Sequence, residues 1–190
     1  MPNESPPLTQ AHLTTSETIE TLLQRRSIRK YNNEPVTDEQ VDAILRASFR
    51  APTSSNIQSY SVITVRDPET KQKLSVPTGN QKHIIDCPVF LAFCADLTRL
   101  EHVLQGHGHT LQDNNMEIGL VSSIDASLVG MSAYLAAESL GIKGVMIGAV
   151  RNDAIKIAKI LGLPKFVYCV FGMCLGYPDE LPAQKPRMQQ

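Results

Sequence analysis

Apolar residues repeat at helical spacing in several parts of the chain, and capping signals mark where these helices begin. Thr14 and Glu17 have the spacing of a capping box, which predicts the start of a first helix. Its apolar face consists of Ile19, Leu22 and Leu23. The basic sequence RRSIRKY follows directly, so we expect it at the end of this helix.

A second capping box, formed by Thr37 and Gln40, predicts a better-defined helix. Pro52 ends this helix, because proline cannot donate the hydrogen bond that a helix interior needs. The residues on its core-facing stripe are Val41, Ile44, Leu45, Ser48 and Phe49. The polar sequence TSSNIQ then predicts a loop before a strand at residues 59–65, and a short helix is expected after the Asp-Pro pair at position 67.

The longest helix is predicted from Met116 to Leu140, where Gly141 supplies a stop signal. The residues near one face are Ile118, Val121, Ile124, Asp125, Leu128, Met131 and Leu135. The segment is also rich in small residues, as expected of a helix packed on several sides. A last helix is expected from its cap at Asn152 to Leu161.

Three more apolar segments predict further strands. Residues 89–95, VFLAFCA, are apolar without alternation, which indicates a central strand buried on both faces. Residues 144–150 predict a short strand or turn, and residues 166–176 predict the last strand. Residues 99–115 are polar and contain Gly and His, so we expect a mobile excursion there. Strands and helices interleave, which indicates a mixed α and β class with one sheet covered by helices.

Composition narrows the class of protein. The 190 residues suffice for one domain with a substantial core, which we expect at residues 14–190, after a disordered tail at residues 1–13. The net charge of -1 argues against a non-specific nucleic-acid binder, because such proteins carry a basic field. No uninterrupted apolar run approaches a membrane span, and the polar N-terminus lacks the features of a signal peptide. We therefore expect no membrane partner and a cytoplasmic location.

The four cysteines form no CxxC pair. They are Cys87, Cys94, Cys169 and Cys174. Three of them lie in apolar runs, where free cysteine behaves as a small buried hydrophobe. Reactive or metal-binding thiols need polar, accessible surroundings. We therefore expect these cysteines to pack in the core.

Two basic clusters near the ends of the chain are the leading candidates for ligand binding. They contain Arg25, Arg26, Ser27 and Arg29 in RRSIR, and Lys185 and Arg187 in KPR. Guanidinium forks beside a hydroxyl suit a phosphate, and Arg29 would share a face with Arg25 on a continuing helical turn. Each cluster alone also fits a plain basic helix end or a basic tail. Together they would clamp one phosphorylated ligand, provided that the fold brings positions 25 and 187 together.

Other polar motifs are weaker when taken alone. The loop TSSNIQ offers uncharged hydroxyls and amides, and Gly148 lets backbone N–H groups approach a ligand or simply ends a strand. A metal site made of His102, His107, His109 and Asp113 matches no strong zinc spacing and is the least favoured alternative. No GxGxxG motif, P-loop or Ser/His/Asp arrangement is visible.

The order of these motifs resembles the nitroreductase family, most closely its oxygen-insensitive NADPH nitroreductase and flavin reductase branch. The segments that carry the resemblance are RRSIRKY, EPVTDEQVDAILRASFRAPTSSNIQSYSVI, TGNQKHI, VFLAFCADLTRL, AAESLGIKGVMIGAVRND, VFG and CLGYP with the later KPR. The resemblance covers residues 15–187 and implies an α+β fold with a central, mostly antiparallel sheet covered by helices. It also implies a homodimer that binds FMN at the subunit interface.

By position, the resemblance implies which residues bind the flavin. They are Arg25, Arg26, Ser27, Arg29, Thr53, Ser54, Ser55, Gln81, Met146, Ile147, Gly148, Ala149, Lys185 and Arg187. The two basic clusters would hold the phosphate, except that Arg29 would approach the N1/O2 edge of the ring. The loop at 53–55 would reach the flavin from the partner subunit, and Gln81 would contact the pyrimidine ring. Residues 146–149 would line the ring, and Arg151 would lie near the phosphates of NAD(P)H.

The resemblance further implies ping-pong hydride transfer from NADPH or NADH to small planar oxidants, namely nitroaromatics, quinones or free flavins. The resemblance implies that no protein nucleophile is needed, and the sequence nominates no catalytic acid. Relatives continue past KPR with an arm that embraces the partner and contacts NADPH, and we expect the domain here to lack that arm. A non-catalytic or regulatory FMN-binding protein with an impaired nicotinamide site therefore stays open as an alternative.

Overall fold

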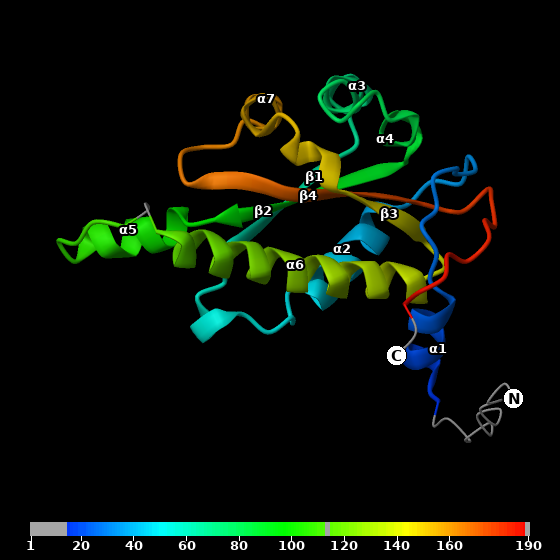
Figure 1. Cartoon of the computed structure of the whole chain (residues 1–190), viewed down its shortest axis with the longest axis horizontal. Helices are drawn as coiled ribbons and strands as arrows, with labels where there is room; N and C mark the ends of the chain where they lie inside the picture. The colour runs from blue at the N-terminus through cyan, green and yellow to red at the C-terminus, as the bar shows by residue number, and fades with distance from the viewer. Residues whose placement is uncertain (1–14, 113–114, 189–190) are drawn as a thin grey trace, which may run out of the picture.

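A four-stranded antiparallel sheet lies at the centre of the protein (Figure 1). The computed structural model describes residues 15–112 and 115–188, so the tail expected at 1–13 lies outside the described residues. The strands are β1 (Tyr60–Val65), β2 (Val89–Asp96), β3 (Lys143–Ile147) and β4 (Val167–Gly176). Their order across the sheet is β1-β2-β4-β3, and every neighbouring pair is antiparallel. This arrangement confirms the mixed class with one sheet that the sequence indicates.

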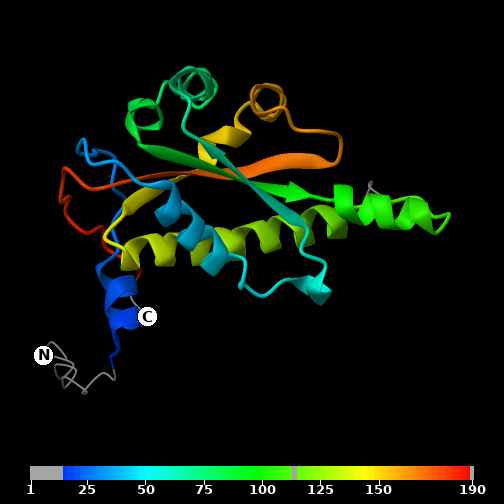
Figure 2. The ribbon, with the colours of Figure 1, turned by 180° about the vertical axis from the view of Figure 1, so that it is seen from behind.

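Helices cover both faces of the sheet (Figures 1 and 2). One face carries α2 (Asp38–Ser48) and α6 (Met116–Ser139), and the other carries α3 (Pro68–Ser75), α4 (Lys82–Asp86) and α7 (Ala154–Leu161). Alternate residues of β2 enter the two cores, since Leu91 joins the α2–α6 side and Phe90 the α3–α7 side. Every residue of β2 is buried, which confirms the central strand and explains why its sequence does not alternate.

All four cysteines are buried and free, which confirms their expected packing in the core. They lie in the cluster on the α3–α7 side of the sheet. Burial raises the pKa of the Cys174 thiol. Burial therefore holds the Cys174 thiol in its neutral form.

Local capping fixes where the helices begin. The box predicted at Thr37 is present, because its hydroxyl accepts from the Gln40 N–H at 3.2 Å and its own N–H donates to Gln40 Oε1 at 2.9 Å. The cap of α1 (Glu17–Gln24) is Ser16, whose hydroxyl accepts from the Ile19 N–H at 3.3 Å, and Thr14 lies outside the described residues. The cap of α7 is Asp153, one residue after the predicted Asn152.

The basic sequence RRSIRKY does not continue the first helix, so the expected shared face of Arg25 and Arg29 is wrong. Helix α1 ends at Gln24, and the chain is extended beyond it. The Ile28 N–H donates to the Gly144 carbonyl of β3 at 3.0 Å. Tertiary contacts therefore take up the backbone groups that a longer helix would have paired internally.

The segment predicted as a loop at 99–115 is partly helical. It contains helix α5 (Thr98–Gly106), which has no side-chain cap at its N-cap residue Leu97. Asp96, one residue earlier, accepts the Thr98 N–H at 2.9 Å. The short helix α4 was not predicted either, because its five residues are too few for a periodic pattern.

Helix α6 matches its predicted length to within one residue, but its buried face differs from the predicted one. The buried residues are Ser122, Asp125, Ala126, Val129, Gly130, Ala133, Tyr134, Ala137 and Glu138. Four large apolar residues, Leu120, Ile124, Leu128 and Met131, instead form an exposed row between 39% and 51% accessible. Small residues face the sheet because they allow the helix to approach it closely, as at Gly130, where an added Cβ would lie 2.2 Å from Phe171.

By length and composition alone, α6 is apolar enough to cross a membrane. Core helices pass the same test, and α6 packs one side against the sheet. The packing of α6 against the sheet therefore accounts for its length and its apolar composition.

Candidate functional site

The two basic clusters meet in space. Arg25, Arg26, Ser27 and Arg29, from the extended segment after α1, line one hollow of about 80 Å³. The other side consists of Pro182, Ala183, Gln184, Lys185 and Arg187, from the segment after β4. We call this the basic hollow. The condition under which the two clusters were predicted to act together is therefore met.

Backbone pairing between the two segments forms the basic hollow. The Asn32 N–H donates to the Tyr177 carbonyl at 3.0 Å, and the Asp179 N–H donates to the Lys30 carbonyl at 3.0 Å. The Arg29 N–H donates to Glu180 Oε1 at 2.7 Å. Residues more than 140 positions apart are thus joined as neighbouring extended chains, which no local pattern in the sequence reveals.

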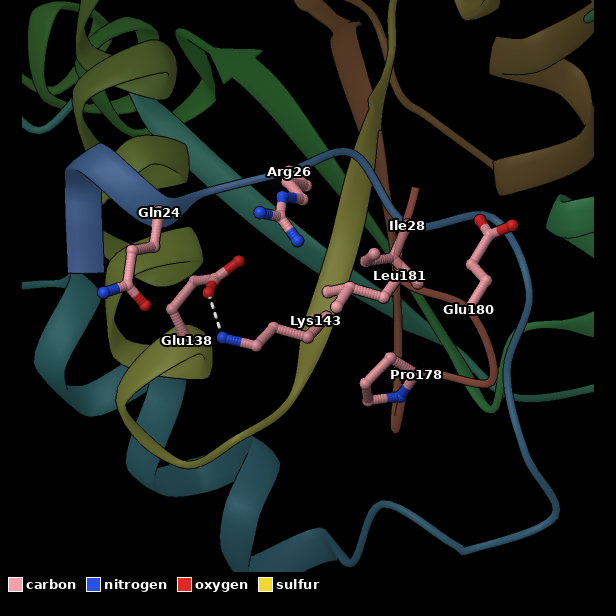
Figure 3. A pocket seen from close by; sticks show the side chains of 8 residues that line it. All are labelled: Gln24, Arg26, Ile28, Glu138, Lys143, Pro178, Glu180 and Leu181. Atoms are coloured by element: carbon pink, nitrogen blue, oxygen red, sulfur yellow. Dashed lines mark hydrogen bonds and ion pairs between the residues drawn. The ribbon is translucent and has the colours of Figure 1, made fainter. Parts of the chain in front are cut away.

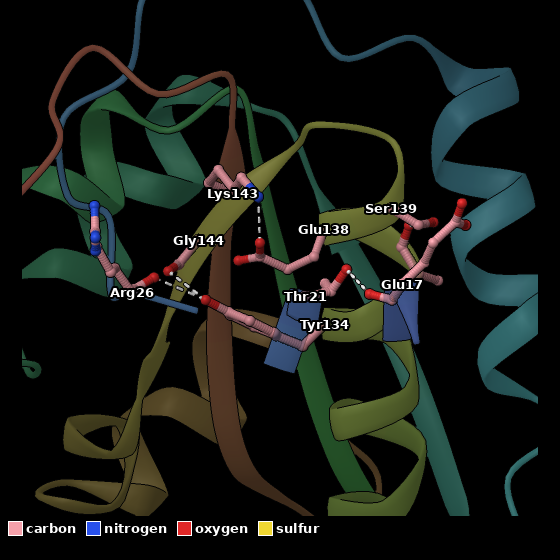
Figure 4. Close-up of polar contacts among 9 residues, drawn as sticks. Glu17, Thr21, Arg26, Tyr134, Glu138, Ser139, Lys143 and Gly144 are labelled. Atoms are coloured by element: carbon pink, nitrogen blue, oxygen red, sulfur yellow. Dashed lines mark hydrogen bonds and ion pairs between the residues drawn. The ribbon is translucent and has the colours of Figure 1, made fainter. Parts of the chain in front are cut away.

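Tyr134 of helix α6 reaches the backbone of Arg26, in the segment that lines the basic hollow (Figure 4). Its hydroxyl donates to the Arg26 carbonyl at 2.9 Å, and the Gly144 carbonyl lies 3.3 Å from the same oxygen. The Arg25 guanidinium carbon lies 5.3 Å from the centre of the Tyr134 ring, a cation–π contact. Burial raises the pKa of Tyr134, so the hydroxyl stays a donor. Tyr134 therefore fixes the backbone on which the arginines stand.

The charges of the basic hollow fit a phosphate group. None of Arg25, Arg26, Arg29, Lys185 and Arg187 forms an ion pair with a carboxylate of the described residues. The Arg26 Nε is buried and has no hydrogen-bond partner among the described groups. Several unpaired cations beside a buried donor without an acceptor favour a bound anion, and a phosphate has enough oxygens to accept from all of them.

A second, larger cleft adjoins the basic hollow. It has a volume of about 820 Å³, shares Ser27, Arg29 and Pro182 with the basic hollow, and extends to Lys82 and His83 of α4. Burial lowers the pKa of His83, and the positive charge of Arg29 lowers it further. Gln81 directly precedes α4 and donates to the Thr78 carbonyl at 2.8 Å. Arg29 thus lies between the basic hollow and the N-terminal end of α4, which Gln81 directly precedes.

A third cavity, of about 270 Å³, is lined in part by Arg26 (Figure 3). The ion pair between Lys143 and Glu138 lies at its wall, and Glu138 Oε1 is buried without a hydrogen-bond partner among the described groups. Pro178, Glu180 and Leu181 close the other side. This cavity places a carboxylate close to the arginine cluster without pairing it to any of the arginines.

The segment predicted to line the flavin ring continues from β3. Met146 is 36% exposed, Ile147 is buried, and Gly148 begins a 3₁₀ turn, η2 (Gly148–Arg151). Arg151 folds over this turn, since an added Cβ on Gly148 would lie 3.2 Å from its guanidinium. Its Nη1 donates to the Val170 carbonyl at 2.5 Å. In this structure Arg151 therefore ties the turn to β4, and its role toward NAD(P)H stays a prediction.

The predicted loop residues Thr53, Ser54 and Ser55 do not line the basic hollow of their own chain. They lie in and before the 3₁₀ turn η1 (Ser54–Asn56), near the N-terminal half of α6, whereas α1 lies near the C-terminal end of α6 (Figures 1 and 2). The basic hollow is lined by the segment that directly follows α1. Asp125 accepts a hydrogen bond from this loop and Tyr134 donates one to Arg26. Nine residues of helix separate them, roughly 14 Å along the axis.

Four residues at these sites had no predicted role. Tyr134 and Glu180 hold the arginine segment, Gln184 donates to the Leu23 carbonyl, and Asp125 accepts from the loop at 53–59. Asp125 carries a visible signal, because it is a lone acidic residue within a long apolar, small-residue segment. A charge at such a position is kept only when it is paired or hydrogen-bonded.

The proposed histidine metal site receives no support from the geometry. His102 lies on α5, while His107 and His109 follow it, and Asp113 lies outside the described residues. No group of three or more His, Cys, Asp or Glu side chains in the described ranges is arranged to hold a metal ion.

Comparison with known proteins gives a consistent result. The sequence model of the nitroreductase family matches residues 22–177. The FMN reductase [NAD(P)H] of Bacillus subtilis is 43% identical over 177 residues, covering 92% of this chain and 71% of its own. The oxygen-insensitive NADPH nitroreductase of Salmonella typhimurium is 39% identical, covering 91% and 70%. The solved NADPH:FMN oxidoreductase of Vibrio harveyi, complexed with NAD+, superimposes with a TM-score of 0.85 at 40% identity, over 90% of this chain and 73% of its own.

Proposed function

Because the chain belongs to the nitroreductase family and is an NAD(P)H-dependent oxidoreductase, we propose that it binds FMN and reduces nitroaromatics, quinones or free flavins. The observation that carries the proposal is the basic hollow, where five cations from both ends of the chain surround one space and none is paired with a carboxylate of residues 15–112 or 115–188. When bound, FMN supplies the chemistry of accepting a hydride and passing electrons on.

The residues of this chain then have separate roles. Arg25, Arg26 and Lys185 hold the phosphate, and the orphaned Arg26 Nε gains its acceptor. Arg29, at the junction with the larger cleft, directs positive charge toward the ring. That charge favours reduction, because it stabilises the negative charge that reduction adds. The protein thus contributes position and electrostatics, and no side chain needs to act as a nucleophile.

A second copy of the chain completes the site in this proposal. The loop at 53–55 lies away from the basic hollow of its own chain. The exposed apolar row on α6 offers a surface for a partner, and α1 adds Ile19, Leu22 and Leu23, all at least 40% exposed. Exposed apolar faces of this kind mark protein interfaces. We therefore propose a homodimer in which the loop of one chain meets the basic hollow of the other.

The test is anaerobic reduction of the purified, FMN-loaded protein. We expect flavin absorbance after purification or after adding FMN, and rapid bleaching on adding NADPH or NADH. The two donors are compared at equal concentration, so that the difference in bleaching rate identifies the preferred donor. A colourless protein that takes up no FMN would contradict the proposed cofactor. Bound flavin that no donor bleaches would favour the non-catalytic alternative. We propose a cytoplasmic location for this activity, which cell fractionation tests.

A further inference from the structure

The loop between α2 and β1 has an unusual backbone. Ser55, Asn56 and Gln58 have positive φ angles of 48°, 55° and 56°. Residues with a side chain seldom adopt this left-handed region, so three of them within four positions need outside support. The chain has no glycine in this loop to relieve the strain.

Asp125 supplies part of that support from α6. Its side chain is fully buried, and its two carboxylate oxygens act on different parts of the loop. Oδ1 accepts the Ser54 N–H at 2.9 Å, and Oδ2 accepts the Ser59 N–H at 3.1 Å. One carboxylate thus closes a loop of six residues by fixing a donor at each end.

Arg99, on α5, holds the same loop through its acceptors. Its Nη2 donates to the Gln58 carbonyl at 2.5 Å and to the Tyr60 carbonyl at 2.7 Å. The loop is therefore fixed by an acidic side chain at its N–H groups and by a basic one at its carbonyls. Both side chains come from helices outside the loop.

The hydroxyls of the loop remain free for another molecule. Ser54 and Ser55 are exposed and Thr53 is half-exposed. In the described part of the chain, none of these three hydroxyls makes a hydrogen bond, although the Ser54 N–H is bonded to Asp125 and the Ser54 carbonyl accepts from the Ile57 N–H. A rigid backbone that presents unused hydroxyls is preorganised for a ligand.

We propose that Asp125 is a positioning residue for flavin binding. It holds the loop so that the hydroxyls of Thr53, Ser54 and Ser55 face the flavin in a second copy of the chain. This inference rests on the proposed function, because the ligand of the loop is the FMN bound by the partner's basic hollow. Asp125 itself is buried and touches no ligand.

The central test is Asp125→Asn, which keeps the shape of the side chain. Its amide nitrogen must face one of the two backbone N–H groups, so only one hydrogen bond survives. We expect the Kd for FMN to rise at least about tenfold, the change that follows from losing one charge-assisted hydrogen bond. Amide hydrogen exchange at Ser54 or Ser59 should accelerate as well. Asp153→Asn is the matched control, because Asp153 caps α7 with one hydrogen bond and Asn caps equally well.

Hydrogen exchange without flavin keeps the two proposals apart. If the wild type binds no FMN, the proposed function fails, while faster exchange at Ser54 or Ser59 in Asp125→Asn still supports the hold on the loop. If Asp125→Asn is a folded dimer with unchanged exchange and unchanged FMN affinity, the positioning role is wrong. A lower melting temperature with unchanged FMN affinity also overturns it, because Asp125 would then stabilise the fold without affecting how FMN binds.

A second pair of variants decides the question if Asp125→Asn does not fold. Ser54→Pro removes the N–H that Asp125 accepts, at the first position of a helical turn, where proline is well tolerated. Ser54→Ala removes only the hydroxyl and keeps the N–H. We expect FMN to bind about tenfold more weakly to Ser54→Pro than to Ser54→Ala. Equal affinities of the two variants would overturn the proposal.

Discussion

Arg26 divides its backbone and its side chain between two tasks. Its carbonyl accepts from Tyr134 at 2.9 Å and is thereby fixed to the core helix. Its Nε is buried and lacks an acceptor among the described groups. An unpaired buried donor costs about 1–3 kcal/mol, so the folded protein is destabilised there until a ligand supplies an acceptor. Bound FMN should therefore raise the melting temperature as well as bring activity.

Arg29 should matter for both binding and reduction. We expect Arg29→Ala to weaken FMN binding by about 1.5–3 kcal/mol and to slow flavin reduction, because a charge-assisted contact to the ring is lost. Fluorescence titration measures the affinity, and stopped-flow absorbance measures the rate. Lys159→Ala, which removes an exposed positive charge on α7, should change neither value. Unchanged affinity and rate in Arg29→Ala would count against its assigned role.

His83 should make the protein less stable as the pH falls. Burial and Arg29 hold its pKa below the ordinary value of 6.5, so the unfolded chain binds a proton more readily than the folded one. Stability from this residue is present above about pH 6.5 and is lost below it. We expect His83→Gln to reduce the fall in unfolding free energy between about pH 7 and about pH 5.5. Urea unfolding without flavin measures it, with exposed His102→Gln as the control.

At the scale of elements, helix α6 shows what the sequence could and could not predict. Its ends follow from local signals, the Asn115 cap and the glycine at 141, so its length was predictable. Its buried face was not predictable, because large apolar residues normally mark the core. Here the small residues of α6 pack against the sheet, and a row of its large apolar residues remains exposed. Similarly, RRSIRKY is extended because its backbone forms hydrogen bonds with β3 and with Tyr134 of α6 instead of continuing a helix. The sequence pattern carries no sign of these contacts.

Two glycines on α6 should respond in opposite directions to the same change. Gly130→Ala would place a Cβ 2.2 Å from Phe171, and overpacking of this kind costs about 1–3 kcal/mol. Gly119→Ala meets nothing closer than the Tyr168 hydroxyl at 3.8 Å, so the helix should gain up to about 1 kcal/mol. Chemical denaturation of both variants measures the difference. Equal effects of the two changes would contradict the close approach of α6 to the sheet.

At the scale of the molecule, the sequence predicted the fold class, the central strand and the pairing of the two basic clusters. The central strand was predictable because burial on both faces removes alternation from its sequence. The clusters required the extended segment at 25–32 to lie beside residues 177–180, a long-range pairing that only the family resemblance indicated. The lone charge of Asp125 indicates that this side chain must have polar partners. The sequence does not identify them, because they depend on which loop α6 contacts.

The exposed row on α6 should control both assembly and cofactor binding. We expect Leu128→Glu to convert the proposed dimer to monomers, because a charge would be buried at the interface. FMN affinity should fall with it, since the loop at 53–55 then has no partner to reach. Light scattering after gel filtration measures the mass, and titration measures the affinity. Ile155→Glu, on the exposed side of α7, should alter neither. A dimeric Leu128→Glu protein would place the interface elsewhere.

The separation of the loop from the basic hollow within one chain has a consequence for mixtures of two variants that each bind FMN weakly. Suppose that Arg29→Ala damages only the hollow and Asp125→Asn only the loop. A mixed dimer then contains one site with both defects and one with neither. Unfolding and refolding the two variants together should restore about a quarter of all sites, since random pairing makes half of the dimers mixed. If each chain supplied its own loop, every site would keep one defect and the mixture would regain nothing.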